Sequence, residues 1–313
     1  MKIGILFPGY GSQHLGMAKN LYDEYRIIQE YFEEATNCLD INFVKLCFSS
    51  SEPELSQIKN AHASIFLISA SIAALLKEEG VKATFVAGSG SGGMAATFAS
   101  GGISFPDGLY ILNKYCTFYE EFLKNNDVSA ILISKISEAE LKDMCNNCSK
   151  DGLLATISFY ISDNQFVVAG NTEAVDCVRR LCQDSGRKVS HYPIESGLHN
   201  ELMADVVKQA RVYLEKIDFK DVEVPVISDV NGNEVTDKNI FTDGFGIQIL
   251  SPIRWDFVLD KMEDMDLIIQ VGPGTELADG AKIRFPRKKI IAINEPQDVN
   301  ELLEYLILRQ TKE

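Results

Sequence analysis

The feature that most constrains this chain is a glycine-rich stretch at residues 87–96, with the sequence AGSGSGGMAA. We expect a strand over 84–87 and a helix over 94–100. A tight turn between a strand and a helix is the setting in which a G-x-S-x-G motif exposes a nucleophilic serine at a helix N-terminus. In the frame Gly88–Gly92, the serine position holds Gly90. The sequence therefore predicts the turn of such a site without its usual nucleophile.

Length and composition narrow the class of protein. The chain has 313 residues and 46% hydrophobic residues, which suits one large domain or a large domain with a smaller insertion. The formal net charge of −15 argues against nucleic acid and anionic membranes as partners. No apolar run approaches the roughly 18 residues of a membrane helix, and residues 1–7 resemble a buried strand more than a secretion signal. These features predict a cytoplasmic protein.

The cysteine pattern gives little support to a metal or redox site. Seven cysteines are scattered singly, apart from Cys145 and Cys148 in one CxxC. A CxxC without a second pair or a nearby histidine is a weak signal. We expect free thiols, as in a reducing cytoplasm, no metal site and no permanently bound cofactor.

The order of strand and helix signals predicts an α/β fold. Over the first ~125 residues, strands and helices alternate as in a parallel sheet with crossover helices. The expected elements of this larger part are strands 3–7, 84–87, 225–230, 267–271 and 289–293, and helices 17–36, 61–77, 107–124, 201–217 and one after Trp255.

A different pattern interrupts this order between residues 128 and 194. Its β-α-β-β-α-β sequence is the ferredoxin-like split motif. The expected elements are strand 129–134, helix 138–148, strands 153–161 and 165–169, helix 172–185 and strand 188–194. We therefore predict a large α/β-hydrolase-like domain with a parallel sheet, formed by 1–127 and 195–313, and an inserted ferredoxin-like subdomain over 128–194.

Five segments along nearly the whole chain match, in order, the motifs of one known family. They are 7–17 (family FPGQGSQxxGM), 87–96 (AGHSLGEYAA) with 102–105, 194–203 (around the catalytic histidine), 248–255 (QLxxPVxW) and 271–274 (VGPG). With these segments the chain resembles the malonyl-CoA:acyl carrier protein transacylases and, more broadly, the acyltransferase domains of fatty-acid and polyketide synthesis.

The resemblance implies a two-step acyl transfer. The elbow serine attacks the thioester of acyl-CoA, and the phosphopantetheine thiol of acyl carrier protein then resolves the acyl-enzyme. A histidine oriented by a carbonyl oxygen removes the serine proton, and two backbone N–H groups stabilise the oxyanion. An arginine binds the malonyl carboxylate. Acyl-CoA and acyl carrier protein are the implied partners, coenzyme A thioester and phosphopantetheine the implied ligands, and a monomer the implied state.

Some of these roles carry over by position. His199 matches the general base, and Gln248 matches the residue whose main-chain carbonyl orients that base. The oxyanion hole would use the N–H groups of Ser91 and of Tyr10, where the family has glutamine. Because these donors belong to the backbone, the change to tyrosine need not remove them.

Four positions depart from the family pattern. Gly90 replaces the nucleophile, Ser89 the preceding histidine and Gly93 the following glutamate. Tyr115 stands at the position of the carboxylate-binding arginine, so the resemblance does not extend to malonyl specificity.

Three functions are compatible with a site that keeps some of the family's residues and lacks others. The first is an acyltransferase in which Ser91, after a one-residue slip of the elbow, works with His199. The second is a non-catalytic protein that binds carrier protein or acyl-phosphopantetheine. The third is a hydrolase in which His199 activates water on acyl thioesters. Ungapped agreement on both sides of the turn, and glycine's tolerance of a strained backbone, favour an elbow without a nucleophile.

A basic cluster near the C-terminus has two interpretations. Lys282, Arg284, Arg287, Lys288 and Lys289 lie within eight residues of an acidic chain. They could steer an acidic carrier protein, but a solvated helix end before the last strand is the interpretation we favour.

Overall fold

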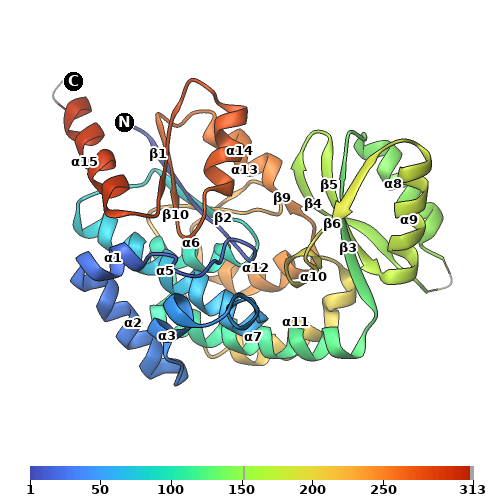
Figure 1. Cartoon of the computed structure of the whole chain (residues 1–313), viewed down its shortest axis with the longest axis horizontal. Coiled ribbons are helices and arrows are strands. Elements are labelled where there is room, and N and C mark those ends of the chain that lie inside the picture. The colour runs from blue at the N-terminus through green and yellow to red at the C-terminus, as the bar shows by residue number, and fades with distance from the viewer. Residues whose placement is uncertain (151, 311–313) are drawn as a thin grey trace.

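The computed structural model describes residues 1–150 and 152–310, arranged as a larger and a smaller lobe side by side (Figure 1). The larger lobe holds a six-stranded sheet in the order β11-β10-β1-β2-β7-β8, and the smaller lobe a five-stranded sheet in the order β6-β3-β5-β4-β9. The strands are β1 Ile3–Phe7, β2 Phe85–Gly88, β3 Val128–Ser134, β4 Ala155–Ser162, β5 Gln165–Asn171, β6 Lys188–His191, β7 Val226–Ile227, β8 Glu234–Val235, β9 Ile253–Arg254, β10 Leu267–Val271 and β11 Lys289–Ile293.

Helices pack around both sheets. They are α1 Lys19–Glu24, α2 Arg26–Leu39, α3 Phe43–Ser49, α4 Glu52–Leu55, α5 Ile58–Glu78, α6 Gly92–Ala99, α7 Phe105–Asn125, α8 Glu138–Cys148, α9 Thr172–Asp184, α10 Ile194–Gly197, α11 Ala204–Leu214, α12 Lys238–Leu250, α13 Trp255–Met262, α14 Glu276–Arg284 and α15 Pro296–Gln310, with a 3₁₀ turn at Glu201–Met203.

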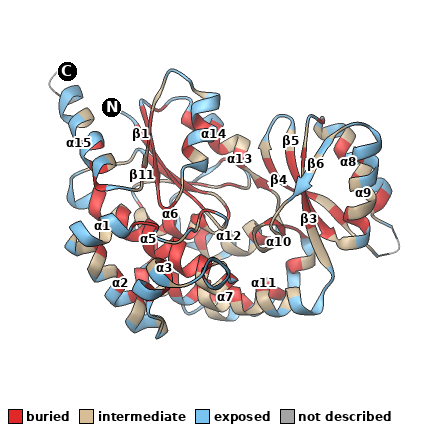
Figure 2. Ribbon diagram, in the orientation of Figure 1, coloured by how far each residue is buried: buried red, intermediate tan, exposed pale blue. Residues whose placement is uncertain are grey.

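The larger sheet is the parallel sheet that the sequence predicts. β1 lies between β10 and β2 and pairs in parallel with both, so that Ile5 is opposite Ile269 and Val86. Every residue of β1 and β10 is buried, as expected for a parallel sheet with both faces covered (Figure 2). Only β8, at the edge, pairs antiparallel within the described part of this sheet. The predicted α/β fold is therefore confirmed.

The long helix α5 corrects one expectation. By length and composition it could cross a membrane, although the sequence suggested that no apolar run comes close to that length. In the structure, 78% of its apolar window is buried. It packs against α7 and α2 in the core of the larger lobe, and a buried core helix passes the same test of length and composition.

The smaller lobe has the predicted ferredoxin-like order. Its strands β6, β3, β5 and β4 are antiparallel, and α8 and α9 pack on them over a separate hydrophobic core. The short strand β9, from the later part of the chain, joins this sheet parallel to β4. The last predicted strand is too long: β6 ends at His191, and α10 begins at Ile194 directly after Pro193, which has no N–H to donate to a ladder.

A disulfide in the smaller lobe contradicts the expectation of free thiols for two of the seven cysteines, whereas the other five are free. Cys148, at the end of α8, is bonded to Cys177 on α9, with 5.8 Å between the two Cα atoms. Cys145 stays free and buried, so the two cysteines of the CxxC do not pair with each other. Disulfides persist in oxidising surroundings, so this pair does not support the reducing compartment that free thiols would indicate.

Candidate active site

The glycine turn joins β2 to α6 as a tight elbow. Gly90 sits at its apex with φ +54°, a left-handed conformation that costs an L-residue free energy. Beneath it the backbone is closely packed, since a Cβ on Gly88 would lie 2.0 Å from the carbonyl carbon of Gly92. The predicted strand and helix are each placed within two residues of their observed bounds.

His199 faces the vacant side of this apex. A Cβ built on Gly90 would lie 3.8 Å from Nε2 of His199. The other ring nitrogen, Nδ1, lies 3.1 Å from the main-chain oxygen of Gln248 and donates to it, which leaves Nε2 as the basic nitrogen of the neutral ring. Burial lowers the pKa of His199, although the carbonyl of Gln248 offsets part of the effect. The imidazole is therefore neutral at pH 7.

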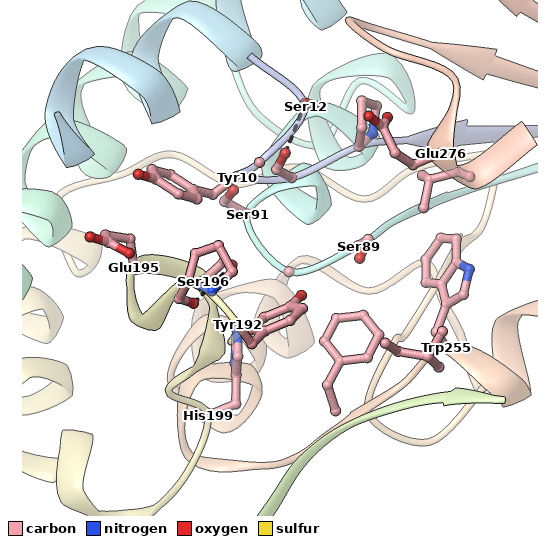
Figure 3. Close-up of a pocket in the computed structure, with 18 of the residues that line it drawn as sticks. Tyr10, Ser12, Ser89, Ser91, Tyr192, Glu195, Ser196, His199, Trp255 and Glu276 are labelled. Carbon is pink, nitrogen blue, oxygen red and sulfur yellow. Dashed lines mark hydrogen bonds between the residues drawn. The ribbon is translucent and has the colours of Figure 1, made fainter. Parts of the chain in front are cut away.

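The two serines of the elbow do not approach this imidazole. In Figure 3, Ser91 lies beside Tyr10, and Ser89 lies on the side of Trp255. The hydroxyl of Ser91 is turned toward Gly9, because a Cβ built on Gly9 would lie 3.4 Å from the Ser91 oxygen. Within the described residues, no hydrogen bond joins Ser91 to His199.

The two backbone groups expected to form an oxyanion hole lack partners within the chain. Across residues 1–150 and 152–310, neither the N–H of Tyr10 nor that of Ser91 donates a hydrogen bond to another protein group. The side chain of Tyr10 is held by a hydrogen bond from its hydroxyl to the main-chain oxygen of Ser56, at 2.8 Å. Burial, together with the charge of Glu195, raises the pKa of Tyr10 to about 12, so the phenol stays protonated.

Aromatic rings form one end of the cavity, where the resemblance would place an arginine. Tyr115 is 8% exposed, and its ring centroid lies 5.7 Å from that of Tyr119 and 5.6 Å from that of Phe245. The cavity has a volume of about 540 Å³. Arg284 is the one lysine or arginine among its described lining residues, and it is 2.7 Å from Asp260 in an ion pair.

Two buried polar residues of the site escaped the sequence analysis. Asp229 lies just beyond β7, and its carboxylate accepts hydrogen bonds from the N–H of Gly90 at 3.0 Å and from the side-chain amide of Gln248 at 2.9 Å. Burial raises the pKa of Asp229 to about 7. Neither residue type nor spacing marked this position, because its role depends on segments far apart in the chain.

His62, on α5, is the second of these residues. It lines the cavity between Tyr10 and Tyr115, with ring centroids 5.4 and 6.5 Å away. Neither ring nitrogen makes a hydrogen bond of normal geometry with another described residue. Burial lowers the pKa of His62 to about 4. The backbone of Glu195 offsets part of this effect, and the neighbouring imidazole of His199 lowers the pKa further.

The basic cluster is largely neutralised by acidic side chains within the chain. Lys282 pairs with Asp279 at 3.2 Å, Lys289 pairs with Glu301, and Lys288 donates to the main-chain oxygen of Met265 at 2.9 Å. In the described part of the chain, no group of three or more His, Cys, Asp or Glu side chains is placed to hold a metal ion.

Comparisons with known proteins agree on one family. The model of the acyl transferase domain matches residues 5–262. The malonyl CoA-acyl carrier protein transacylase of Bacillus subtilis strain 168 is 30% identical over 309 residues, which is 97% of each chain. That of Escherichia coli K12 is 25% identical over 307 residues, 97% of this chain and 99% of the relative.

Solved structures have the same fold. The malonyl CoA-acyl carrier protein transacylase of Coxiella burnetii superposes with a TM-score of 0.92 at 23% identity, over 97% of both chains. A malonyl-transacylase in complex with its type II polyketide-synthase acyl carrier protein also gives 0.92, at 22% identity, over 97% of this chain and 100% of the other. The chain therefore belongs to the acyl transferase family, as a relative of the malonyl CoA-acyl carrier protein transacylases.

Proposed function

We propose that this chain is a malonyl-CoA:acyl carrier protein transacylase-like protein that hydrolyses acyl thioesters without an acyl-enzyme intermediate. The observation that carries the proposal is that His199 lies opposite Gly90 at the apex of the elbow. The base is oriented and neutral, but the position it faces holds a hydrogen atom instead of a hydroxyl-bearing side chain.

Water is the nucleophile that fits this arrangement. In the transfer reaction of the family, acyl-serine stores the acyl group while one thiol leaves and the next arrives. Gly90 has no side chain on which to store it. A water molecule in the place of the missing hydroxyl can be present while the thioester is still bound, and Nε2 of His199 is directed there.

The reaction then needs only this chain's own groups and one water. Nε2 of His199 takes a proton from water as the oxygen attacks the thioester carbonyl carbon. The N–H groups of Tyr10 and Ser91 are the donors for the resulting oxyanion. The tetrahedral intermediate collapses, the C–S bond breaks, and the thiolate takes the proton from His199, which releases a carboxylic acid and a thiol.

The cavity favours an uncharged acyl group over malonyl. Tyr115 offers no positive charge, and the carboxylate of Glu195, which forms no ion pair among the described residues, also lines the cavity. A malonyl carboxylate would therefore be desolvated without a cation to compensate it. The thioesters we propose are those of coenzyme A and of the phosphopantetheine arm of an acyl carrier protein. A monomeric state and a cytoplasmic location stay predictions.

The test is to incubate the protein with acetyl-CoA, and separately with malonyl-CoA, while following thiol release and the intact mass. We expect thiol release from acetyl-CoA with no covalent adduct. The rate should fall about 10²-fold or more in His199→Ala, because a general base contributes about that much. Ser91→Ala is the matched control and should retain the rate.

Other results would contradict the proposal. A stoichiometric acyl adduct that disappears in Ser91→Ala would establish the slipped-elbow transferase instead. Saturable binding of holo-carrier protein without any thiol release would establish a non-catalytic binding protein.

A further inference from the structure

Gly93, which stands where the family has a glutamate, brings the backbone of α6 close to the side chain of Gln248. Gly93 lies in the first turn of α6, and a Cβ on it would stand 3.1 Å from the side-chain nitrogen Nε2 of Gln248. Gly93 and Gln248 also line a second cavity, of about 600 Å³. A glutamate at position 93 would therefore begin in tight contact with that amide, and the cavity leaves room for the rest of its side chain.

A carboxylate from another part of the chain already contacts this amide. Both oxygens of Asp229 lie 2.9 Å from Nε2 of Gln248, and Oδ2 also accepts from the N–H of Gly90 at 3.0 Å. Asp229 is 4% exposed, and no lysine or arginine forms an ion pair with it within the described residues. Three hydrogen bonds from two donors are what compensate its burial.

Gln248 connects this carboxylate to the imidazole. Its Nε2 also donates to the main-chain oxygen of Gly90 at 2.9 Å, and its own main-chain oxygen accepts from Nδ1 of His199 at 3.1 Å. One residue therefore contacts the elbow through its side chain and the base through its backbone. Whatever fixes the amide of Gln248 also fixes the distance between Gly90 and His199.

We propose that Asp229 is a positioning residue that takes over the place of the family's glutamate at position 93. It holds the amide of Gln248, and through Gln248 it keeps His199 directed at the elbow. Burial opposes its ionisation and raises its pKa, whereas the hydrogen bonds from Gln248 and Gly90 lower the pKa, so these donors favour the carboxylate form.

The proposal predicts a change of sign in a double-mutant cycle between Asp229→Asn and Gly93→Glu, measured by urea unfolding. In the native chain, Gly93→Glu should destabilise, because two buried carboxylates would compete for one amide. In the Asp229→Asn variant, the NH₂ group of the new asparagine would face two other donors, those of Gln248 and Gly90. In that background Gly93→Glu should stabilise, because its carboxylate would accept from Gln248. Gly93→Ala in the same background is the matched control and should not restore stability.

A second readout follows the imidazole itself. Solvent exchange of the Nδ1 proton of His199, seen by NMR and assigned by its loss in His199→Ala, should be at least tenfold faster in Asp229→Asn. It should return toward the native rate in the double variant. A merely structural role for Asp229 would change stability without this selective effect on the ring.

Three results would overturn the inference: equal effects of Gly93→Glu in both backgrounds, unchanged exchange of the Nδ1 proton in Asp229→Asn, or failure of both Asp229→Asn and the double variant to fold. If only the single variant fails to fold, folding of the double variant with native exchange supports the inference. No ligand is added, so the result does not depend on whether the protein hydrolyses thioesters.

Discussion

Gly90 and His199 face each other across a gap that a single hydroxymethyl group would fill. A serine at the apex would have to adopt the left-handed conformation that φ +54° describes, which costs an L-residue roughly 1–2 kcal/mol. Glycine adopts it freely. The substitution therefore removes the nucleophile and the backbone strain together, while the base and its partner Gln248 keep their geometry.

Restoring the hydroxyl should restore covalent chemistry. Gly90→Ser is expected to yield a stoichiometric acyl adduct from acetyl-CoA, since its side chain would begin 3.8 Å from Nε2 of His199. Intact mass spectrometry after an acid quench measures the adduct. The double variant Gly90→Ser, His199→Ala is the control and should give less than a tenth of it. No adduct in Gly90→Ser would mean that the rest of the apparatus is not in place.

His62 should make the protein sensitive to acid. Its pKa is about 4 in the folded chain and 6.5 in the unfolded chain, so between these values the unfolded chain binds more protons. Stability is therefore lost as the pH falls from about 6.5 to 4, by up to about 1.4 kcal/mol per pH unit.

His62→Leu should remove that dependence and, at pH 7.5, should stabilise by roughly 1–3 kcal/mol, because a buried polar ring without hydrogen bonds is replaced by a hydrocarbon. Urea unfolding of both proteins from pH 4 to 8 measures the difference. A constant difference across this range would contradict the expectation.

At the scale of elements, the site depends on how closely α6 approaches β1 and β2. A Cβ on Gly92 would lie 2.3 Å from the main-chain oxygen of Phe7, and one on Gly88 would meet the backbone of Gly92. The N-terminus of α6 is thus set against the ends of two strands with no space for a side chain. This contact aims the apex of the elbow into the cavity.

Two glycine-to-alanine substitutions test this packing. Gly88→Ala should destabilise by more than about 3 kcal/mol or prevent folding, because backbone cannot move as a flexible side chain can. Gly280→Ala is the matched control within α14, where nothing lies within 4 Å of the new Cβ, and should stabilise by about 0.5–1 kcal/mol. Thermal unfolding compares them, and similar melting temperatures for both variants would refute the argument.

At the scale of the whole molecule, the site is assembled from segments far apart in the sequence. Gly90 comes from the first half of the larger lobe, His199 from just beyond the smaller lobe and Gln248 from α12. The strand β9 ties the two lobes together by joining the smaller sheet. The whole chain carries a formal charge of −15, and most of the basic cluster is paired internally.

This charge distribution predicts how binding of an acidic carrier protein should depend on salt. Raising the ionic strength from 20 to 200 mM should increase the association rate with holo-carrier protein, because salt screens the repulsion between two acidic molecules. Stopped-flow fluorescence of a labelled carrier protein measures it. A rate that falls with salt would instead indicate that the basic cluster steers docking.

The sequence determined what depends on local pattern. Buried parallel strands such as Leu267–Val271 and Lys289–Ile293 were predicted with their observed bounds, because short apolar runs bounded by turn residues are typical of such strands. The sequence also predicted the elbow, since glycine spacing fixes a turn within a few residues. The strand predicted over 225–230 is shorter in the structure, where β7 covers only Val226–Ile227. The two-residue strands β8 and β9 were not predicted, because only pairing with other strands in the folded chain defines them.

Only the tertiary structure decided what the elbow faces and what supports it. Two of these features join residues that are far apart in the sequence: the contact of Asp229 with Gln248 and the disulfide of Cys148 with Cys177. A third, the buried nitrogens of His62, depends on how the chain packs around that ring. A hydrogen bond or a desolvated ring has no periodicity along the chain. Such features arise when packing excludes water, and the sequence alone does not show where that happens.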